Sequence, residues 1–250
     1  MRVLVLGATV AARKQFATLE FKEWGYFSLL GFLGITFHQW LQSNGLETSE
    51  AGTTAWIMAT TPVFMALLGW LILKERITST KITGMALAFV GVLLVVSHRN
   101  IALISIGKFG APGDMLILVS AINWAIFSAL SRRGLKKYSA SLMIFYVMLF
   151  GWIFTSVLFV YGGNYSELPA LSPHGWLSIL FLGNFCSGLA YIAWYDAFQA
   201  LSTAETGVFF YIEPLVAMVV AFIILGEPIT VASLIGGGII LLGVWLVNKS

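Results

Sequence analysis

Residues 72–78 read Ile-Leu-Lys-Glu-Arg-Ile-Thr, and residues 224–230 read Ile-Leu-Gly-Glu-Pro-Ile-Thr. Each segment lies between two long apolar runs, so each has the composition of a short loop that joins two helices. A biased composition aligns leucines and valines by chance, but it does not readily place a glutamate and a threonine at matching positions. The two segments therefore indicate an internal repeat with an offset of 152 residues.

The same offset holds, without a gap, on both sides of these loops. It aligns uncommon residues with their own kind: Trp24 with Trp176, Gly31 with Gly183, Thr54 with Thr206, Pro62 with Pro214, and Gly84 and Gly91 with Gly236 and Gly243. The sequence therefore predicts two related halves, residues 1–100 and residues 101–250. The first half is the shorter of the two.

The composition excludes a soluble fold. Hydrophobic residues make up 59% of the chain and charged residues 10%, whereas soluble domains carry about 25% charged residues. A helix needs about 20 mainly apolar residues to cross a bilayer. Eight stretches meet this length: 25–44, 51–73, 79–97, 112–131, 139–161, 174–198, 203–225 and 229–248. We therefore predict an all-α membrane protein of about eight full transmembrane helices, plus an N-terminal partial helix over residues 3–12.

Lysine and arginine concentrate in alternate loops, which sets the predicted orientation. Cytoplasmic loops of membrane proteins are enriched in these residues. Two of them, Arg99 and Lys108, lie on the predicted outer side. Eleven lie on the predicted inner side: Arg13, Lys14, Lys22, Lys74, Arg76, Lys81, Arg132, Arg133, Lys136, Lys137 and Lys249. This bias predicts the orientation of a multi-pass membrane protein and explains the net charge of +3 without nucleic acid.

Each predicted helix lies five spanning segments from its counterpart in the other half. Because five is odd, the second copy crosses the membrane in the opposite sense, which is the inverted-repeat architecture of secondary transporters. The second half has five predicted helices, and the first has three and the partial helix. We therefore expect one helix and most of another to precede Met1, although residues 3–12 also have some features of a signal peptide.

These motifs resemble those of the EamA-type branch of the drug/metabolite transporter superfamily. The resemblance covers essentially the whole chain. It rests on Thr206 to Glu213-Pro214, residues 224–230 and 74–78, Gly113-Asp114 leading into Asn123-Trp124-Ala125 and Arg132-Arg133, and the glycine-rich stretch 236–247. It implies a ten-helix inverted-repeat carrier in the cytoplasmic membrane, with both termini inside, that moves amino acids and related metabolites.

Glu213 is the first candidate for a functional residue. It lies in the middle of the predicted helix 203–225, and an ionisable group at membrane depth usually faces a cavity or a partner. Helical spacing places Thr206, Phe209 and Phe210 on the same side. The carboxylate therefore suits contact with a substrate ammonium group or proton coupling. The alternative is a structural acid that hydrogen-bonds to neighbouring helices.

Pro62 and Pro214 occupy matching positions in the two halves. Each removes the backbone donor that the carbonyl four residues earlier, at Met58 or Phe210, would otherwise use. Matching interruptions in inverted halves indicate a binding site. A kink that only improves packing explains them equally well.

The other candidates lie on helices that carry both polar and aromatic residues. Such faces suit a small amphipathic or cationic molecule, through hydrogen bonds and cation–π contacts. Trp194 and Tyr195 also suit anchoring at the membrane interface, and a lone His38 is more often a satisfied interior histidine. An amide at Asn123 needs a partner on a facing helix or a substrate. The predicted substrate-binding residues are His38, Gln39, Asn123, Trp124, Tyr191, Trp194, Tyr195, Phe210 and Glu213.

No motif in the sequence indicates an enzyme. It contains no GxxxxGK[ST], HExxH or GxSxG pattern, and its one cysteine, Cys186, excludes a disulfide within the chain. We predict no metal, no cofactor and no catalysis. The predicted partners are a small-molecule substrate and the lipid bilayer. The small-residue patterns Gly84-x-x-x-Ala88 and Ala232-x-x-x-Gly236 suit either a homodimer or a contact within the chain. The alternative to a carrier is a regulatory or scaffold protein with the carrier fold.

Overall fold

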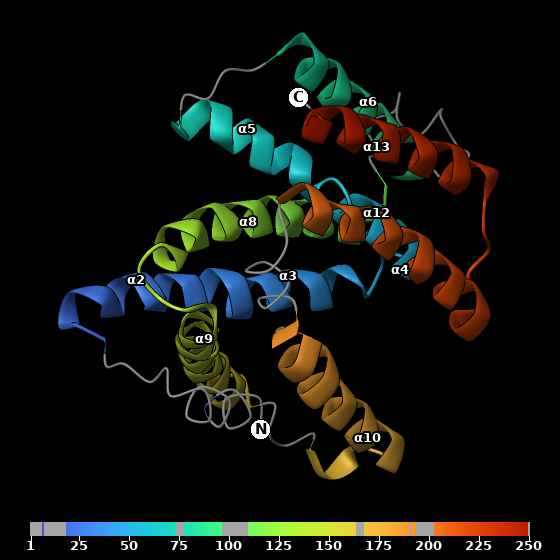
Figure 1. Ribbon diagram of the computed structural model, residues 1–250. Helices are drawn as coiled ribbons and strands as arrows, with labels where there is room; N and C mark the ends of the chain where they lie inside the picture. Colours follow the sequence, from blue (N-terminus) through green and yellow to red (C-terminus); the bar gives the residue numbers. More distant parts are fainter. Residues whose placement is uncertain are drawn as a thin grey trace. The chain divides into compact units, whose positions relative to one another are not determined.

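The computed structural model describes residue 7 and residues 19–73, 78–96, 110–163, 168–190, 192–193 and 203–249 (Figure 1). In these ranges every named element is a helix. The elements are α2 (Phe21–Gly31), η1 (Phe32–Phe37), α3 (His38–Gly45), α4 (Ala51–Met58), α5 (Thr61–Leu73), α6 (Ser79–Val96), α8 (Pro112–Leu135), α9 (Ala140–Tyr161), α10 (Pro173–Phe181), η3 (Leu182–Leu189), α12 (Thr203–Val220), η4 (Ala221–Leu225) and α13 (Val231–Lys249).

The predicted membrane spans agree with these helices. Where the structure describes the end of a predicted span, the observed and predicted boundaries differ by at most four residues. In the described residues, five helices are long and apolar enough to cross a membrane: Ala51–Leu68, α6, α8, α9 and α13. The shorter segment Ile212–Leu225 is also apolar. The chain is thus an all-α, multi-pass membrane protein.

Side-chain caps start several of these helices. Thr78 and Thr230 are the last residues of the two repeated loops and precede α6 and α13. They accept the backbone N–H groups of Lys81 and Ser233 at 3.2 and 3.0 Å. Both threonines are therefore N-caps of the helices that follow them. Ser172 has the same role before Pro173, where it accepts the N–H of Gly175 at 3.1 Å.

The helix starts repeat with the offset found in the sequence. α2, α4 and α6 begin at residues 21, 51 and 79, and α10, α12 and α13 begin at residues 173, 203 and 231, each 152 positions later. The π-helices η1 and η3 also end at equivalent residues, Phe37 and Leu189. Because π-helices are rare and often mark functional positions, their recurrence at one register is independent support for the repeat.

The chain forms two compact units, and each is described by itself. The first contains residues 1–37 and 130–202, and the second contains residues 38–129 and 203–250. In the first unit, α9 packs along α2 and η1. A Cβ on Gly31 would lie 2.7 Å from the backbone nitrogen of Gly151, so only glycine permits this approach. One turn further along, the Thr36 hydroxyl donates to the Gly151 carbonyl at 3.1 Å.

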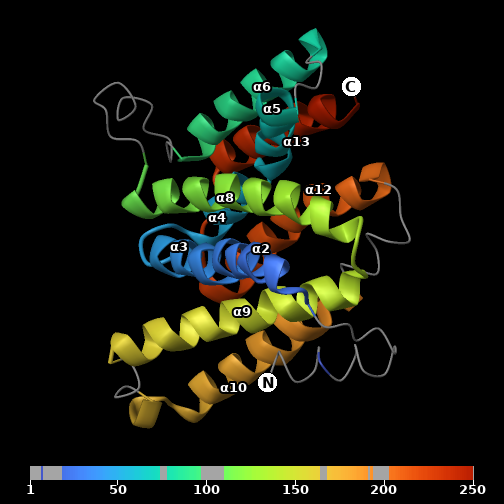
Figure 2. The ribbon, with the colours of Figure 1, turned by 90° about the vertical axis from the view of Figure 1, so that its left-hand side faces the viewer.

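The second unit is built around the pair α6 and α13, which lie side by side in both views (Figures 1 and 2). A Cβ on Gly84 would lie 2.6 Å from the Gly243 carbonyl oxygen, and a Cβ on Gly236 would lie 2.8 Å from that of Gly91. Gly91 approaches the Gly236 carbonyl, and Gly243 approaches that of Gly84, in the same way. Every close contact therefore occurs twice, with the two helices exchanged.

This exchange defines how α6 and α13 are related. Gly84 and Gly236 are repeat equivalents, as are Gly91 and Gly243. Gly84 contacts Gly243, which is the equivalent of Gly91, and Gly91 contacts Gly236, which is the equivalent of Gly84. The two helices therefore run antiparallel about a local two-fold axis. Antiparallel packing of equivalent helices is what an inverted repeat requires. The glycines of the small-residue patterns thus line a contact within the chain.

Polar groups of the second unit meet where the predicted outer loops lie. The Glu227 carboxylate, in the second repeated loop, accepts the N–H groups of Ala51 and Gly52 at 2.8 and 2.9 Å and caps α4. Asp114, at the start of α8, accepts the Ser49 hydroxyl at 2.6 Å. Each of these bonds joins two loops assigned to the same side, as the alternating topology requires.

An ion pair in the first unit joins two loops of the predicted inner side. The Lys137 ammonium group donates to the Glu23 carboxylate. This hydrogen bond is the main cause that lowers the pKa of Glu23 below its ordinary value of 4.5. The same bond raises the pKa of Lys137. The pair therefore ties the start of α2 to the loop before α9.

We predict that Gly84→Leu or Gly91→Leu destabilises the protein by about 1–3 kcal/mol or more, because the added side chain meets backbone atoms of α13. The measurement is thermal unfolding of the purified protein in detergent. Gly238→Leu on α13 is the matched control, since a Cβ there meets nothing within 4 Å. Equal losses for Gly84→Leu and Gly238→Leu would contradict the packing described.

We predict that Glu23→Gln lowers the melting temperature at neutral pH and has no effect in acid. A carboxyl group whose pKa is lowered by folding stabilises the fold above its unfolded-state pKa, and this contribution is lost as the pH falls through the folded-state pKa. Lys137→Gln is expected to have the same profile. Lys136→Gln, which removes a neighbouring exposed charge, is the control, and a Glu23→Gln effect that is independent of pH contradicts the role of the ion pair.

Candidate functional site

Two of the predicted site residues, His38 and Trp124, form a cluster with Ser120 in the second unit. His38 opens α3 and is buried, and its Nδ1 atom lies 2.9 Å from the hydroxyl oxygen of the buried Ser120 on α8. The His38 ring packs against the indole of Trp124, with 4.7 Å between ring centroids. Asn123 is buried on the same helix. This is the one group of predicted residues for which the structure records direct contacts among the described ranges.

The cluster has the chemistry to bind a small polar molecule. A neutral imidazole both donates and accepts a hydrogen bond, and the Ser120 hydroxyl occupies only one of its two nitrogens. Trp124 in turn contacts Phe127, with 5.0 Å between centroids, so an aromatic wall adjoins the polar pair. The pairing with Ser120 also fits the structural alternative for His38, a satisfied interior histidine.

Glu213 lies on α12, one residue before Pro214. Its side chain is exposed, and no hydrogen bond or ion pair to it is found in the part of the chain that the structure describes. The alternative role of Glu213 was that of a structural acid, which hydrogen-bonds to neighbouring helices. No such hydrogen bond is found among the described residues. Thr61 is the repeat equivalent of Glu213, 152 positions earlier.

The two prolines have different local structures. At Pro62 the helix is interrupted: α4 ends at Met58, and α5 begins at Thr61. The carbonyl of Met58, which Pro62 deprives of its usual donor, accepts the Thr61 hydroxyl at 2.6 Å. The neighbouring Thr60 hydroxyl satisfies the Ile57 carbonyl at the same distance. At Pro214, in contrast, α12 continues without a break, and the proline is buried inside the helix.

The remaining predicted residues are not brought into the cluster. Gln39 is exposed. Tyr191, Trp194 and Tyr195 lie outside the described residues, and for Phe210 only the backbone is described.

Sequence reasoning missed two residues of this unit. Ser120 was not singled out, because a single serine on an apolar helix gives no signal until its partner is known. Trp56, on α4, is almost completely buried, and its indole N–H has no hydrogen-bond partner among the residues that the structure describes. Gly237 on α13 leaves the room that its ring needs. A buried donor without a partner costs free energy, so Trp56 is a further candidate to contact a bound molecule.

We predict that Ser120→Ala destabilises the protein by about 1–3 kcal/mol, because it leaves a ring nitrogen of buried His38 without a partner. Thermal unfolding in detergent measures the loss. Ser128→Ala, about two turns further along α8, is the control. Combining Ser120→Ala with His38→Phe is expected to cost less than the sum of the two single changes, and simple additivity contradicts the pairing.

Comparisons with known proteins agree with the sequence and the fold. The chain is 30% identical over 218 residues to the uncharacterized transporter YyaM of Bacillus subtilis, covering 87% of this chain and 71% of that protein. It is 29% identical to an uncharacterized transporter of Archaeoglobus fulgidus, covering 97% and 82%. A probable terminal-alkyne amino-acid exporter of Streptantibioticus cattleyicolor is 28% identical, covering 89% and 72%.

The fold is also known from a solved crystal structure. That structure matches with a TM-score of 0.64 at 18% identity, and the match covers 98% of this chain and 82% of that one. The sequence profile of the EamA-like transporter family matches twice, at residues 2–97 and 111–249. These two matches include nearly all of the chain. This protein therefore belongs to the EamA-like transporter family.

Proposed function

We propose that this protein is a secondary carrier that moves a small metabolite across the cytoplasmic membrane by alternating access between two inverted halves, residues 1–100 and 101–250. The observation that carries the proposal is the reciprocal packing of α6 on α13. Alternating access needs two states of similar free energy in which the halves exchange roles, and a two-fold related pair of helices supplies that exchange. The family profile, which matches once in each half, supports the same division.

We assign the binding site to the second unit, around His38, Asn123 and Trp124, with Glu213 as its titratable group. Gln39 and Phe210 of the same unit complete the proposed site. His38 and Asn123 supply directional hydrogen bonds, and the indole of Trp124 supplies a face for an apolar or cationic group. A site with few polar groups beside aromatic walls suits a small amphipathic molecule.

The substrate class is an amino acid or a related metabolite. One relative is a probable exporter of a terminal-alkyne amino acid. Such a molecule carries an ammonium group, a carboxylate and an apolar side chain, so it needs an acid, hydrogen-bond donors and an apolar wall. Glu213, the imidazole of His38 and the indole of Trp124 meet these three needs.

Glu213 also suits proton coupling, as a comparison with its repeat equivalent Thr61 shows. In the first half, the Thr61 hydroxyl donates to the carbonyl freed by the following proline. A protonated Glu213 has a hydroxyl that can donate to the matching carbonyl of Phe210, but an ionised Glu213 has no proton to donate. Protonation therefore changes which backbone bonds α12 can make next to Pro214, and it links a proton to the local structure of the helix.

The proposal is tested by counterflow in proteoliposomes against a panel of amino acids and quaternary amines, with the Glu213→Gln variant beside the native protein. We expect native flux for at least one amino acid that rises with an imposed proton gradient. An amide mimics the protonated acid as a donor, so Glu213→Gln is expected to reduce gradient-driven flux about tenfold or more, the scale of one charge-assisted hydrogen bond.

Glu47→Gln, in the exposed loop before α4, is the control and is expected to have native flux. Unchanged gradient-driven flux in Glu213→Gln at equal abundance would make Glu213 structural. Absence of flux for the whole panel favours the alternative, a regulatory or scaffold protein that has the carrier fold without transport.

A further inference from the structure

All five lysine and arginine side chains in the described part of the first unit lie at one end of it. Lys22 is at the start of α2, Arg132 and Arg133 are in the last turn of α8, and Lys136 and Lys137 are in the loop that leads to α9. All five are exposed. Both views show the start of α2 next to this loop (Figures 1 and 2). We call the five residues together the basic surface.

Three contacts hold the segments that carry these cations against each other. The Tyr26 hydroxyl of α2 donates to the Leu130 carbonyl of α8 at 2.8 Å. The ring of Phe27 meets the ring of Tyr138 edge to face, with 5.4 Å between centroids. The ion pair described above joins the same segments a third time. The cations are therefore grouped by the packing of the unit and not by a single run of sequence.

The charge of the basic surface is only partly compensated. Among the described residues, Lys137 is the one cation of the five with an ion pair, to Glu23. The other carboxylate near these segments is Glu20, the N-cap residue of α2. Residues 1–19, which precede it, contain no acidic residue. The remaining four cations repel one another, and an anion that binds among them removes part of this repulsion.

The surroundings of the basic surface favour a lipid headgroup over a soluble anion. α8 ends here and α9 begins here, and both are long and apolar enough to cross a membrane, so the cations lie at headgroup depth. Trp24 of α2 is exposed and packs edge-on against Phe150 of α9, as is typical of tryptophans at the membrane interface. A phospholipid can contact both the cations and this apolar surface, whereas a free phosphate contacts only the cations.

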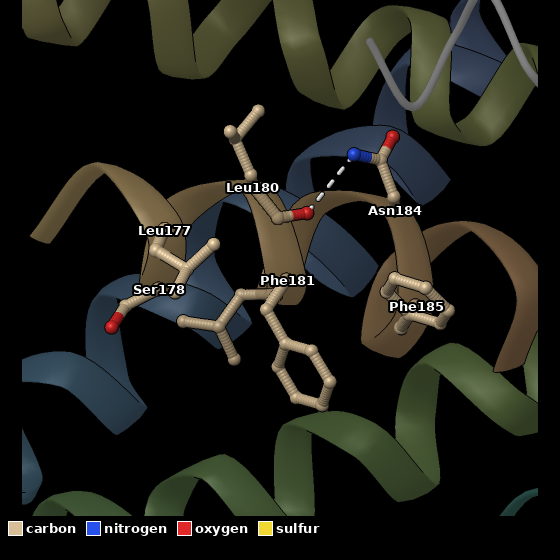
Figure 3. Close-up of a pocket in the computed structure, with 7 residues that line it drawn as sticks. Leu177, Ser178, Leu180, Phe181, Asn184 and Phe185 are labelled. Carbon is tan, nitrogen blue, oxygen red and sulfur yellow. Dashed lines mark hydrogen bonds between the residues drawn. The ribbon is translucent and has the colours of Figure 1, made fainter. Parts of the chain in front are cut away.

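Another surface of the same unit lacks the chemistry to select a headgroup. An open groove of about 600 Å³ on α10 and η3 is lined by seven residues, and none of them is charged (Figure 3). The amide of Asn184 in this groove already donates to the Leu180 carbonyl at 3.0 Å. The acyl chains of any lipid suit such a groove, so selection among lipids requires the cations.

We propose that the basic surface binds the headgroup of an anionic phospholipid, such as phosphatidylglycerol, on the predicted inner side of the membrane. The guanidinium groups of Arg132 and Arg133 can each donate two parallel hydrogen bonds to a phosphate, and Lys22 and Lys136 add point charges. Clusters of four or more such residues beside a spanning helix are typical of anionic-lipid sites. The enrichment of cations in inner loops explains their side of the membrane, but not why two distant segments bring them together.

The test is thermal unfolding of the purified full chain in detergent, with added phosphatidylglycerol or the zwitterionic phosphatidylcholine. We expect phosphatidylglycerol to raise the melting temperature at a lower concentration than phosphatidylcholine does, and high salt to weaken this effect. The triple variant Arg132→Gln/Arg133→Gln/Lys136→Gln is expected to need about a hundredfold more phosphatidylglycerol for the half-maximal rise, at about fivefold for each cation removed. Its three side chains are exposed, so its melting temperature without lipid is expected to be native.

Lys81→Gln/Lys249→Gln is the matched control, because it removes two cations of the predicted inner side that lie in the second unit. It is expected to keep the native response to phosphatidylglycerol. A loss as large as that of the triple variant would mean a general attraction to anionic lipid and would overturn the proposal. Equal effects of the two lipids on the native chain would also overturn it, as would an equal rise in melting temperature with inorganic phosphate in place of lipid.

Discussion

The fold depends on the contact of backbone with backbone between α6 and α13. Lipid chains are as apolar as leucine side chains, so burial from water does not hold membrane helices together once they are inserted. Dispersion contacts do, and they need surfaces that approach closely. Four glycines, Gly84, Gly91, Gly236 and Gly243, permit this approach by having no Cβ where one would meet a carbonyl oxygen or a backbone nitrogen. Equivalent ends of the two halves are thereby held to each other.

Polar interactions are distributed differently from these apolar contacts. Most recorded bonds between side chains or loops lie at the helix ends: Glu227 caps α4, Asp114 accepts Ser49, and Lys137 pairs with Glu23. Inside the spans a polar group without a partner is costly, and the few recorded there are paired, as His38 is with Ser120. Glu213 and Trp56 differ from this pattern in the described part of the chain. A binding site needs groups of this kind, since a group already satisfied by the protein has less to offer a substrate.

The sequence predicted the helices well, but it did not predict which side chains contact one another in the candidate site. Helix positions follow from the length of apolar runs, and the inverted relation of the halves follows from an odd number of spans, so both are local or countable properties. The pairing of His38 with Ser120 joins residues 82 positions apart, and nothing in either segment predicts the other. The same helix interruption was predicted at Pro62 and at Pro214, but the helix ends only at Pro62. The residues that precede the two prolines also differ, with threonine in one copy and glutamate in the other.

That difference between the two copies is the basis of the proton coupling proposed above. Symmetry needs both copies to have the same frame, which the glycines, the π-helices and the helix starts supply. It places no demand on residues that do not contact the other copy. At the position before proline, the Thr61 hydroxyl donates to the freed carbonyl of Met58, and this bond does not depend on a titratable proton. In the mechanism proposed above, Glu213 at the equivalent position donates to its carbonyl only when it is protonated. On that proposal, the hydrogen bond at the proline of the first half does not depend on a proton, whereas the one at the proline of the second half does. Coupling to a proton gradient requires such a difference between two otherwise similar halves.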